Sequence, residues 1–329
     1  MSKAAKEFLF GASPVLAALR ANRRRLIKLH VLHQQEQSSE SSNTNSRKSE
    51  AIRLATALNL KIGNSKSAVS LANLALAPHD SFVHNGLVLE CGLLPIQSIR
   101  GLTFPEIISP LLLSYSAIVT DKEHINFDFT PSSPRQPHSP EISENILQTH
   151  RPPLWLALDN LTDPQNLGAI IRTCRFFSVD GIVATSSSPI TTASCSKASA
   201  GAVESFETLY TTRSLPAFLA ESRANGWSVY GTDLAAQQRR GAVVMNCWDR
   251  RRVQEVHENG VRKPVLLVMG SEGSGIGKAV SNQCDAHLVI PSGFGANADG
   301  GVDNDGGLDS LNVSVATGIL ISSLQRDYL

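Results

Sequence analysis

Short apolar runs separated by polar, helix-like segments recur along the C-terminal half of the chain. They occupy residues 154–158, 181–185, 227–232, 264–270 and 286–291. Runs of this length are typical of strands buried on both faces, and helix-like segments between such strands are typical of parallel sheets. The pattern therefore predicts an α/β domain over residues 154–329, in which helices cover a parallel sheet.

A weaker pattern of the same kind precedes this region. Residues 51–60 have helical spacing, and residues 83–95 resemble a strand with a turn at either end. Together they predict a smaller α/β domain over residues 1–120.

Three polar stretches interrupt the two patterns. Residues 38–49 contain six serines and no hydrophobic residue, which predicts a flexible insertion. Residues 121–153 carry six prolines, and proline removes an amide donor and restricts φ, so we expect a linker without regular structure. Residues 292–309 are rich in glycine and aspartate and are expected to be a second insertion, beside a functional loop.

Composition narrows the class of protein. With 329 residues, 42% of them hydrophobic and 18% charged, the chain is expected to be globular, with about two domains and no membrane span. Its five cysteines form no Cys-x-x-Cys pair, which favours a reducing compartment. The acid-poor, arginine-rich first 30 residues are similar to a mitochondrial transit peptide, so we expect the mitochondrial matrix, with the cytoplasm as the alternative.

Charge is uneven along a chain whose net charge is only +1. The first 36 residues carry seven basic and two acidic residues, a local excess of five positive charges. Within them, a cluster without acidic residues suits a phosphate backbone and is our candidate RNA contact: Arg23, Arg24, Arg25 and Lys28. The alternative is a solvated helix face.

The spacing of residues in this sequence does not match several common binding and catalytic motifs. The glycines at 270–277 lack the Walker pattern, because Glu272 stands where its first glycine belongs, and Lys278 stands where the dinucleotide fingerprint needs its third glycine. A Gly-x-Ser-x-Gly elbow is absent from the sequence. The aspartates of 292–309 lack the closing glutamate of an EF-hand, so no metal is expected.

Three segments of the C-terminal half remain unusual. In the first, a strand ends near Leu158, and Asp163-Pro164 begins a helix that carries Asn166 and Arg172. The second places Gly270 and Glu272 at the carboxyl end of a strand, where open α/β sheets bind ligands. The third runs from Ile290-Pro291 past the insertion to a final helix, for which Ser310 is the predicted N-cap and Asn312 lies just inside.

Taken in order, these segments resemble the three motifs of the SpoU (TrmH) branch of the SPOUT methyltransferases. The motifs read DPQNLGAIIRT, VMGSEGSGIG and VIP followed by SLNVSVATGILI, and SKASAGAVE at 196–204 matches a fourth family segment. FLFGASPVLAAL at 8–19 and VHNGLVLE at 83–90 resemble, more loosely, the RNA-binding domain of ribosomal RNA ribose methyltransferases. The 18-residue insertion at 292–309 departs from the family, in which this step is short.

The resemblance implies a knotted catalytic domain, a small N-terminal domain similar to a ribosomal protein, and a homodimer. It implies S-adenosylmethionine as the cofactor, held by backbone near Gly270, Ile290 and Leu311. The methyl group would pass to a ribose 2′-hydroxyl, here of a guanosine in large-subunit ribosomal RNA.

The same resemblance implies a polar catalytic set, consisting of Arg172, Asn166, Glu272, Ser310 and Asn312. Because a guanidinium stays protonated at neutral pH, we expect Arg172 to stabilise the developing 2′-alkoxide or to fix a phosphate that takes the proton. Two alternatives stay open, a transfer-RNA ribose methyltransferase of the same branch and a non-catalytic RNA-binding assembly factor.

Overall fold

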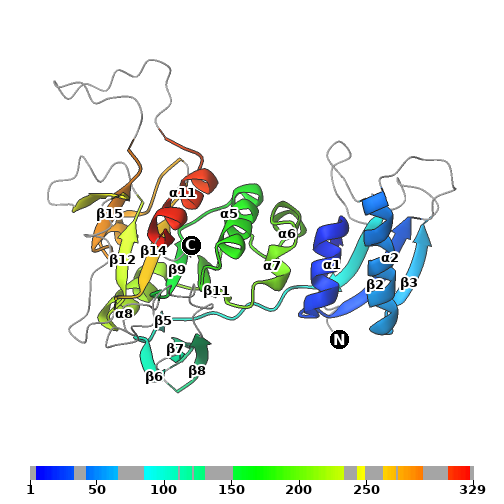
Figure 1. Ribbon diagram of the computed structural model, residues 1–329, viewed down its shortest axis with the longest axis horizontal. Helices are drawn as coiled ribbons and strands as arrows, with labels where there is room; N and C mark the ends of the chain where they lie inside the picture. Colours follow the sequence, from blue (N-terminus) through cyan, green and yellow to red (C-terminus); the bar gives the residue numbers. More distant parts are fainter. Residues whose placement is uncertain are drawn as a thin grey trace, which may run out of the picture. The chain divides into compact units, whose positions relative to one another are not determined.

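The structure is a computed structural model of the whole chain (Figure 1). It describes residues 5–32, 42–65, 85–109, 112–120, 122–129, 151–232, 243–248, 262–271, 273–291 and 310–326. These residues form two compact units. The first comprises residues 1–96, 162–175 and 189–209, and the second comprises residues 97–161, 176–188 and 210–329.

A four-stranded sheet with two helices forms the N-terminal part of the first unit. Its elements are β1 (Lys6–Phe10), α1 (Ala12–Ala21), β2 (Leu26–Leu32), α2 (Ser42–Ala57), β3 (Lys61–Ser65) and β4 (Leu87–Gly92). The strand order is β1-β4-β2-β3, with β4 antiparallel to both neighbours and β2 parallel to β3. Leu9, Leu29 and Leu89 of the strands pack against Val15 and Leu19 of α1, which gives this part a core of its own.

Helix α2 corrects one expectation. The flexible insertion predicted at 38–49 is wrong from Ser42 onward, where the helix begins, whereas residues 38–41 lie outside the described part. The helix predicted at 51–60 extends toward the N-terminus into the serine-rich stretch, as far as Ser42. Ala51 and Ala55 are fully buried in the core, and exposed Arg20 of α1 pairs with Glu50 at 2.7 Å.

Three helices from the C-terminal half complete the first unit: α5 (Pro164–Phe176), α6 (Ala193–Ala198) and α7 (Ala202–Ser205). The helix predicted to begin at Asp163-Pro164 is confirmed. Thr192 caps α6 by accepting a hydrogen bond from the Cys195 amide.

A seven-stranded sheet organises the second unit (Figure 1). Its strands are β9 (Leu154–Leu158), β10 (Gly181–Thr185), β11 (Leu209–Thr212), β12 (Ser228–Gly231), β13 (Val244–Asn246), β14 (Val265–Met269) and β15 (Ala286–Val289). The order is β11-β10-β9-β14-β12-β15-β13, and the pairs from β10 to β13 are parallel. All five predicted strands are confirmed, and the α/β class with them. The short strands β11 and β13 were not predicted from the sequence.

Helices α8 (Leu215–Ala224), α10 (Lys278–Ser281) and α11 (Val313–Gln325) belong to the same unit. Phe218 and Leu219 of α8 share a buried cluster with Val229 of β12 and Leu266 of β14. Among the described residues, no helix combines the length and the apolar character needed to cross a bilayer.

A third, antiparallel sheet lies where the prediction placed the end of one domain and a linker. It contains β5 (Gly101–Leu102), β6 (Glu106–Ser109), β7 (Leu112–Ile118) and β8 (His124–Phe129), and it belongs to the second unit. The predicted boundary at 120 and the linker beginning at 121 are therefore wrong. The missed signal is the alternation in HINFDF, because Ile125 and Phe127 pack against the core of the unit.

Candidate active site

The carboxyl ends of the parallel strands in the second unit carry several of the predicted residues. Gly270 follows β14 directly, and Ile290 follows β15 directly. Since the strands are parallel, both residues reach the same edge of the sheet, where ligands of open α/β folds bind. The backbone at Gly270 is buried, whereas Ile290 is half-buried.

The loop after β14 folds back on itself. The Ser271 amide donates to the Gly275 carbonyl at 3.1 Å, and the Gly275 amide donates to the Ser271 carbonyl at 2.9 Å. Gly275 has φ +62°, and a Cβ at Gly270 would lie 2.2 Å from the Gly275 carbonyl carbon. Glycine at 270 is therefore a steric requirement of the loop. Glu272, the predicted catalytic residue, lies outside the described residues.

Asp159 anchors this loop to the end of the neighbouring strand β9, although this residue was not predicted from the sequence. The carboxylate is buried, with the residue 3% exposed, and its Oδ2 accepts the Gly277 amide at 2.8 Å. Its own amide donates to the Met269 carbonyl at 2.9 Å. The available signal was its position, an acidic residue directly after the fully apolar β9.

The start of α11 corrects the predicted cap. The N-cap is Asn312, not Ser310, because the Asn312 Oδ1 accepts the Ser314 amide at 2.9 Å and the helix begins at Val313. Ser310, Leu311 and Asn312 form one exposed stretch before the helix, with Leu311 44% exposed. The cap explains an asparagine that helix propensity left unexplained.

Helix α5 of the first unit carries Asn166 and Arg172. Asp163 caps the helix, because its carboxylate accepts the amides of Gln165 and Asn166 at 3.0 and 3.4 Å. Asn166 is half-buried, whereas Arg172 is exposed. Within the described part of the chain, the Arg172 guanidinium makes no ion pair or hydrogen bond. Its charge is therefore available to a ligand.

The basic cluster divides into two kinds of residue. The prediction that Arg24 contacts RNA is wrong. Its side chain is fully buried and ion-paired with Glu204 and Glu7, so it presents nothing to RNA. Burial alone would lower the pKa of Arg24, but the hydrogen bond and charge of Glu204, with the charge of Glu7, raise that pKa above its ordinary value.

The other basic residues differ in exposure. Arg23 is half-buried and donates to the carbonyls of Glu204 and Phe206 at 3.3 and 2.7 Å. Arg25 is exposed and Lys28 is half-buried. Arg25 also lines a hollow of about 510 Å³ together with Asn22, Asn59 and Lys61.

The described residues bring together no group of three or more histidine, cysteine, aspartate or glutamate side chains suited to a metal ion. The aspartates of 292–309 lie outside the described residues. All five cysteines are free thiols, and burial raises the pKa of Cys91 to about 12.

Two solved methyltransferases share this fold. The rRNA methyltransferase of Sinorhizobium meliloti, solved with AdoMet bound, superposes with a TM-score of 0.59 at 18% identity, covering 98% of this chain and 88% of that one. The SpoU methyltransferase AviRb of Streptomyces viridochromogenes, also in complex with AdoMet, gives a TM-score of 0.56 at 15% identity, covering 98% of this chain and 90% of that one. The α/β fold is therefore that of the SpoU methyltransferases.

Sequence comparison gives the family. The model of the "SpoU rRNA Methylase family" matches residues 153–322, slightly more than half of the chain. The protein belongs to the SpoU rRNA methylase family.

Two mitochondrial proteins illustrate the likeness. The Schizosaccharomyces pombe "rRNA methyltransferase 1, mitochondrial" is 32% identical over 248 residues, covering 73% of this chain and 68% of that protein. Its Dictyostelium discoideum namesake is 40% identical over 182 residues, covering 55% of this chain but only 30% of that longer protein.

A bacterial relative carries a more specific name. The "23S rRNA (guanosine-2'-O-)-methyltransferase RlmB" of Neisseria meningitidis is 29% identical over 199 residues, covering 60% of this chain and 67% of that protein.

Proposed function

We propose that this protein transfers a methyl group from S-adenosylmethionine to the 2′-hydroxyl of a guanosine ribose in large-subunit ribosomal RNA, in mitochondria. The observation that carries the proposal is the family membership of residues 153–322 together with Arg172, an exposed guanidinium on α5 without an ion-pair partner among the described residues. The names of the bacterial and mitochondrial relatives support the guanosine, the ribosomal substrate and the compartment.

The strand edge of the second unit fits the cofactor. A Cβ at Gly273 would meet nothing within 4 Å, so the backbone there is open to a ligand, and Ile290 and Leu311 add partly exposed apolar surface suited to an adenine ring. Gly270, Ile290 and Leu311 would hold the cofactor in this way. When bound, S-adenosylmethionine supplies an activated methyl group on a sulfonium, so the reaction needs no metal.

Arg172 provides a fixed positive charge. Because its guanidinium stays protonated at neutral pH, it acts on charge and not as a base: it stabilises the developing 2′-alkoxide or fixes a neighbouring phosphate that takes the proton. Asn166 lies on the same helix, and Glu272, Ser310 and Asn312 complete the proposed polar set.

RNA contact is assigned to the N-terminal sheet domain. Arg25 and Lys28 remain candidates, with Arg25 beside the hollow that Lys61 also lines, whereas Arg23 already donates to two carbonyls. The 2′-hydroxyl distinguishes RNA from DNA at the reacting atom.

A homodimer and a knotted catalytic domain complete the proposal. Helix α11 supports the dimer, because no charged residue occurs between Val313 and Gln325, and Val315 is 50% exposed. An uncharged helix with exposed apolar side chains is suited to burial against a second copy of the chain.

The test uses the purified chain, labelled S-adenosylmethionine and large-subunit ribosomal RNA transcripts. We expect alkali-resistant label at one guanosine and a loss of at least about 100-fold in Arg172→Ala. Arg175→Ala is the matched control, because Arg175 is exposed on the same helix one turn away and should keep the activity. Label on transfer RNA instead would favour that substrate, and cofactor binding without transfer to any RNA would favour the assembly factor.

A further inference from the structure

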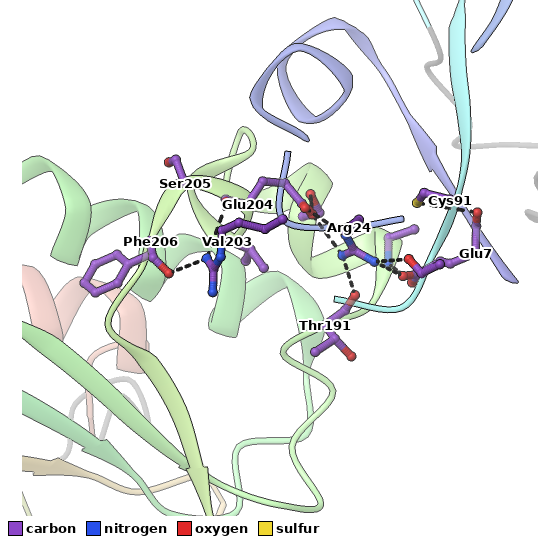
Figure 2. Close-up of polar contacts among 12 residues, drawn as sticks. Glu7, Arg24, Cys91, Thr191, Val203, Glu204, Ser205 and Phe206 are labelled. Atoms are coloured by element: carbon purple, nitrogen blue, oxygen red, sulfur yellow. Dashed lines mark hydrogen bonds and ion pairs between the residues drawn. The ribbon is translucent and has the colours of Figure 1, made fainter. Parts of the chain in front are cut away.

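Within the first unit, a buried network of charged side chains connects the N-terminal domain to helices α6 and α7, and we call this contact the polar joint (Figure 2). Arg24 follows α1, and its side chain has no exposed surface. Its guanidinium donates to both carboxylate oxygens of Glu204, from Nε at 2.7 Å and from Nη2 at 2.9 Å. Nη1 donates to the Glu7 carboxylate at 2.6 Å, and Nη2 also donates to the Thr191 carbonyl at 3.0 Å.

The two carboxylates are satisfied as fully as the guanidinium. Glu204, whose side chain is 1% exposed, also accepts the Ser196 hydroxyl at 2.9 Å. Glu7 of β1 accepts the Ala193 amide at 2.7 Å through its second oxygen. Arg23 adds its two bonds to the carbonyls that flank Ser205. Arg24, Glu204 and Glu7 therefore each bond to residues on both sides of the joint, and Arg23 adds two bonds across it.

Shape complementarity surrounds the network. Gly201, which has φ +86°, lies so close to α1 that a Cβ there would be 2.6 Å from the Ala17 Cβ and 2.8 Å from the Ser13 carbonyl oxygen. A Cβ at Gly11, on the other side, would lie 2.5 Å from the Lys197 Nζ. Gly201, just before α7, thus approaches the backbone of α1 closely, and Lys197 of α6 lies over Gly11.

The same helices contact α5 on their other side. A Cβ at Gly168 of α5 would lie 2.5 Å from the Ala198 Cβ and 2.7 Å from the Cys195 carbonyl oxygen. Residues 193–205 therefore lie between the N-terminal domain and the helix that carries Arg172, and all three belong to one compact unit.

We propose that Arg24 and Glu204 are positioning residues for methyl transfer. By joining the N-terminal domain to α6 and α7, they fix the orientation of bound RNA toward α5 and Arg172. A buried, bidentate network is satisfied in one orientation only, whereas an apolar contact of the same size tolerates sliding. The inference rests on the proposed methyltransferase function and assigns to these residues no contact with RNA or cofactor.

The test compares three full-length variants on a large-subunit ribosomal RNA transcript. Glu204→Gln keeps the shape of the side chain but removes its charge, and Arg24→Lys keeps the charge but loses the guanidinium fork. Arg20→Ala is the control, because Arg20 is a 58% exposed arginine of the same domain, paired with Glu50 outside the network. Methyl transfer is measured as kcat and KM for RNA, and cofactor affinity by calorimetry.

We expect both network variants to lower kcat/KM for RNA at least tenfold, with the affinity for S-adenosylmethionine within twofold of the wild type. Arg20→Ala should match the wild type in every measurement. A merely stabilising network would instead lose activity in proportion to the unfolded fraction, so cooling the assay until circular dichroism shows a folded variant would restore the rate.

Two further outcomes separate this inference from the proposed function. An active wild type with unchanged RNA kinetics in folded Glu204→Gln and Arg24→Lys would overturn the positioning role alone. A wild type that binds the cofactor but methylates no RNA would overturn the proposed function and the positioning role together. If Glu204→Gln does not fold, Arg24→Lys decides the question by itself.

Discussion

Two contacts between parts of the molecule differ in the side chains that form them, and we call them the polar joint and the aromatic joint. In the first unit, Arg24, Glu204 and Glu7 connect the N-terminal sheet to α6 and α7 through charges and carbonyls. In the second, aromatic rings connect the antiparallel sheet to the parallel one: Tyr115, Phe127, Trp155, Tyr210 and Trp227. Two hydrogen bonds accompany these rings, from the Trp155 indole to the Tyr115 hydroxyl at 2.9 Å and from the Trp227 indole to the Thr103 carbonyl at 2.8 Å.

The difference concerns what each joint specifies. Burial of rings is strongly stabilising and weakly directional, so the aromatic joint is suited to holding two sheets together. A buried ion pair adds little to the free energy of unfolding compared with an apolar core, because desolvation opposes the attraction of the charges. Any arrangement that leaves one of these charges buried and unpaired is, however, strongly unfavourable. The polar joint is therefore suited to setting an orientation.

The aromatic joint should show the largest effect when it is broken. Trp155 is fully buried, and Trp155→Ala removes a large ring from the centre of the cluster. We expect a loss of about 3–5 kcal/mol in the free energy of unfolding of the second unit. Urea denaturation followed by tryptophan fluorescence reports this unit, because the first contains no tryptophan. A loss below about 1 kcal/mol would show that the rings are not a cooperative core.

The second-largest loss in the free energy of unfolding is expected when one member of the polar joint is removed. Arg24→Met leaves the buried Glu204 and the half-buried Glu7 carboxylates without their cation, and we expect a loss of about 3 kcal/mol. Replacing Glu204 by leucine in the same chain should restore part of that stability while leaving the RNA kinetics impaired. Far-UV circular dichroism follows the secondary structure of both units, and an unchanged tryptophan transition assigns the loss to the first unit. A double variant less stable than Arg24→Met would contradict the account.

A smaller effect is expected when a single hydrogen bond of the aromatic joint is removed. Tyr115→Phe keeps the ring but leaves the buried Trp155 indole N–H without its acceptor, so we expect a loss of about 1–3 kcal/mol. Burial raises the pKa of the Tyr115 hydroxyl, which therefore stays a neutral acceptor at physiological pH. A tryptophan-detected urea transition measures the effect, and coincidence with the wild-type curve would refute the importance of this bond.

Acid should weaken the first unit through His30. This side chain is 8% exposed, and burial together with the charge of Lys28 lowers its pKa, with Glu90 opposing the shift. A lowered folded-state pKa means that the unfolded chain binds more protons, so stability is full above pH ~6.5 and is lost as the pH falls through the folded pKa. Thermal melts between pH 8 and 5 should show this fall, and His30→Gln should flatten it.

The smallest effect is expected at the exposed pair in the same domain. Arg20→Ala removes the ion pair with Glu50, and solvent screening makes such surface pairs weak. The melting temperature should stay within experimental error of the wild type at both low and high salt. A salt-dependent drop would show that charge pairs in this domain act alike, whether buried or exposed.

Much of the catalytic half was predictable from local signals. Apolar runs marked β9, β10, β12, β14 and β15, because a strand buried on both faces needs no partner information to be recognised. Gly270 was singled out through the family resemblance, as a residue that holds the cofactor, whereas its close contact with the Gly275 backbone is a finding of the structure. The alternation in β8 was also local, but the prolines that follow it obscured it.

The remaining features depend on residues that are distant in sequence. The parallel α/β class, the SpoU motifs and the placement of Arg172 on a helix could all be predicted from the chain alone. That Arg24 is buried, and so presents nothing to RNA, became evident from the fold, because its partner Glu204 lies 180 residues away. The same holds for Asp159, whose carboxylate meets the Gly277 amide 118 residues later. A basic cluster has the same pattern whether it faces phosphate or a buried carboxylate, and only the fold supplies the neighbour that distinguishes the two.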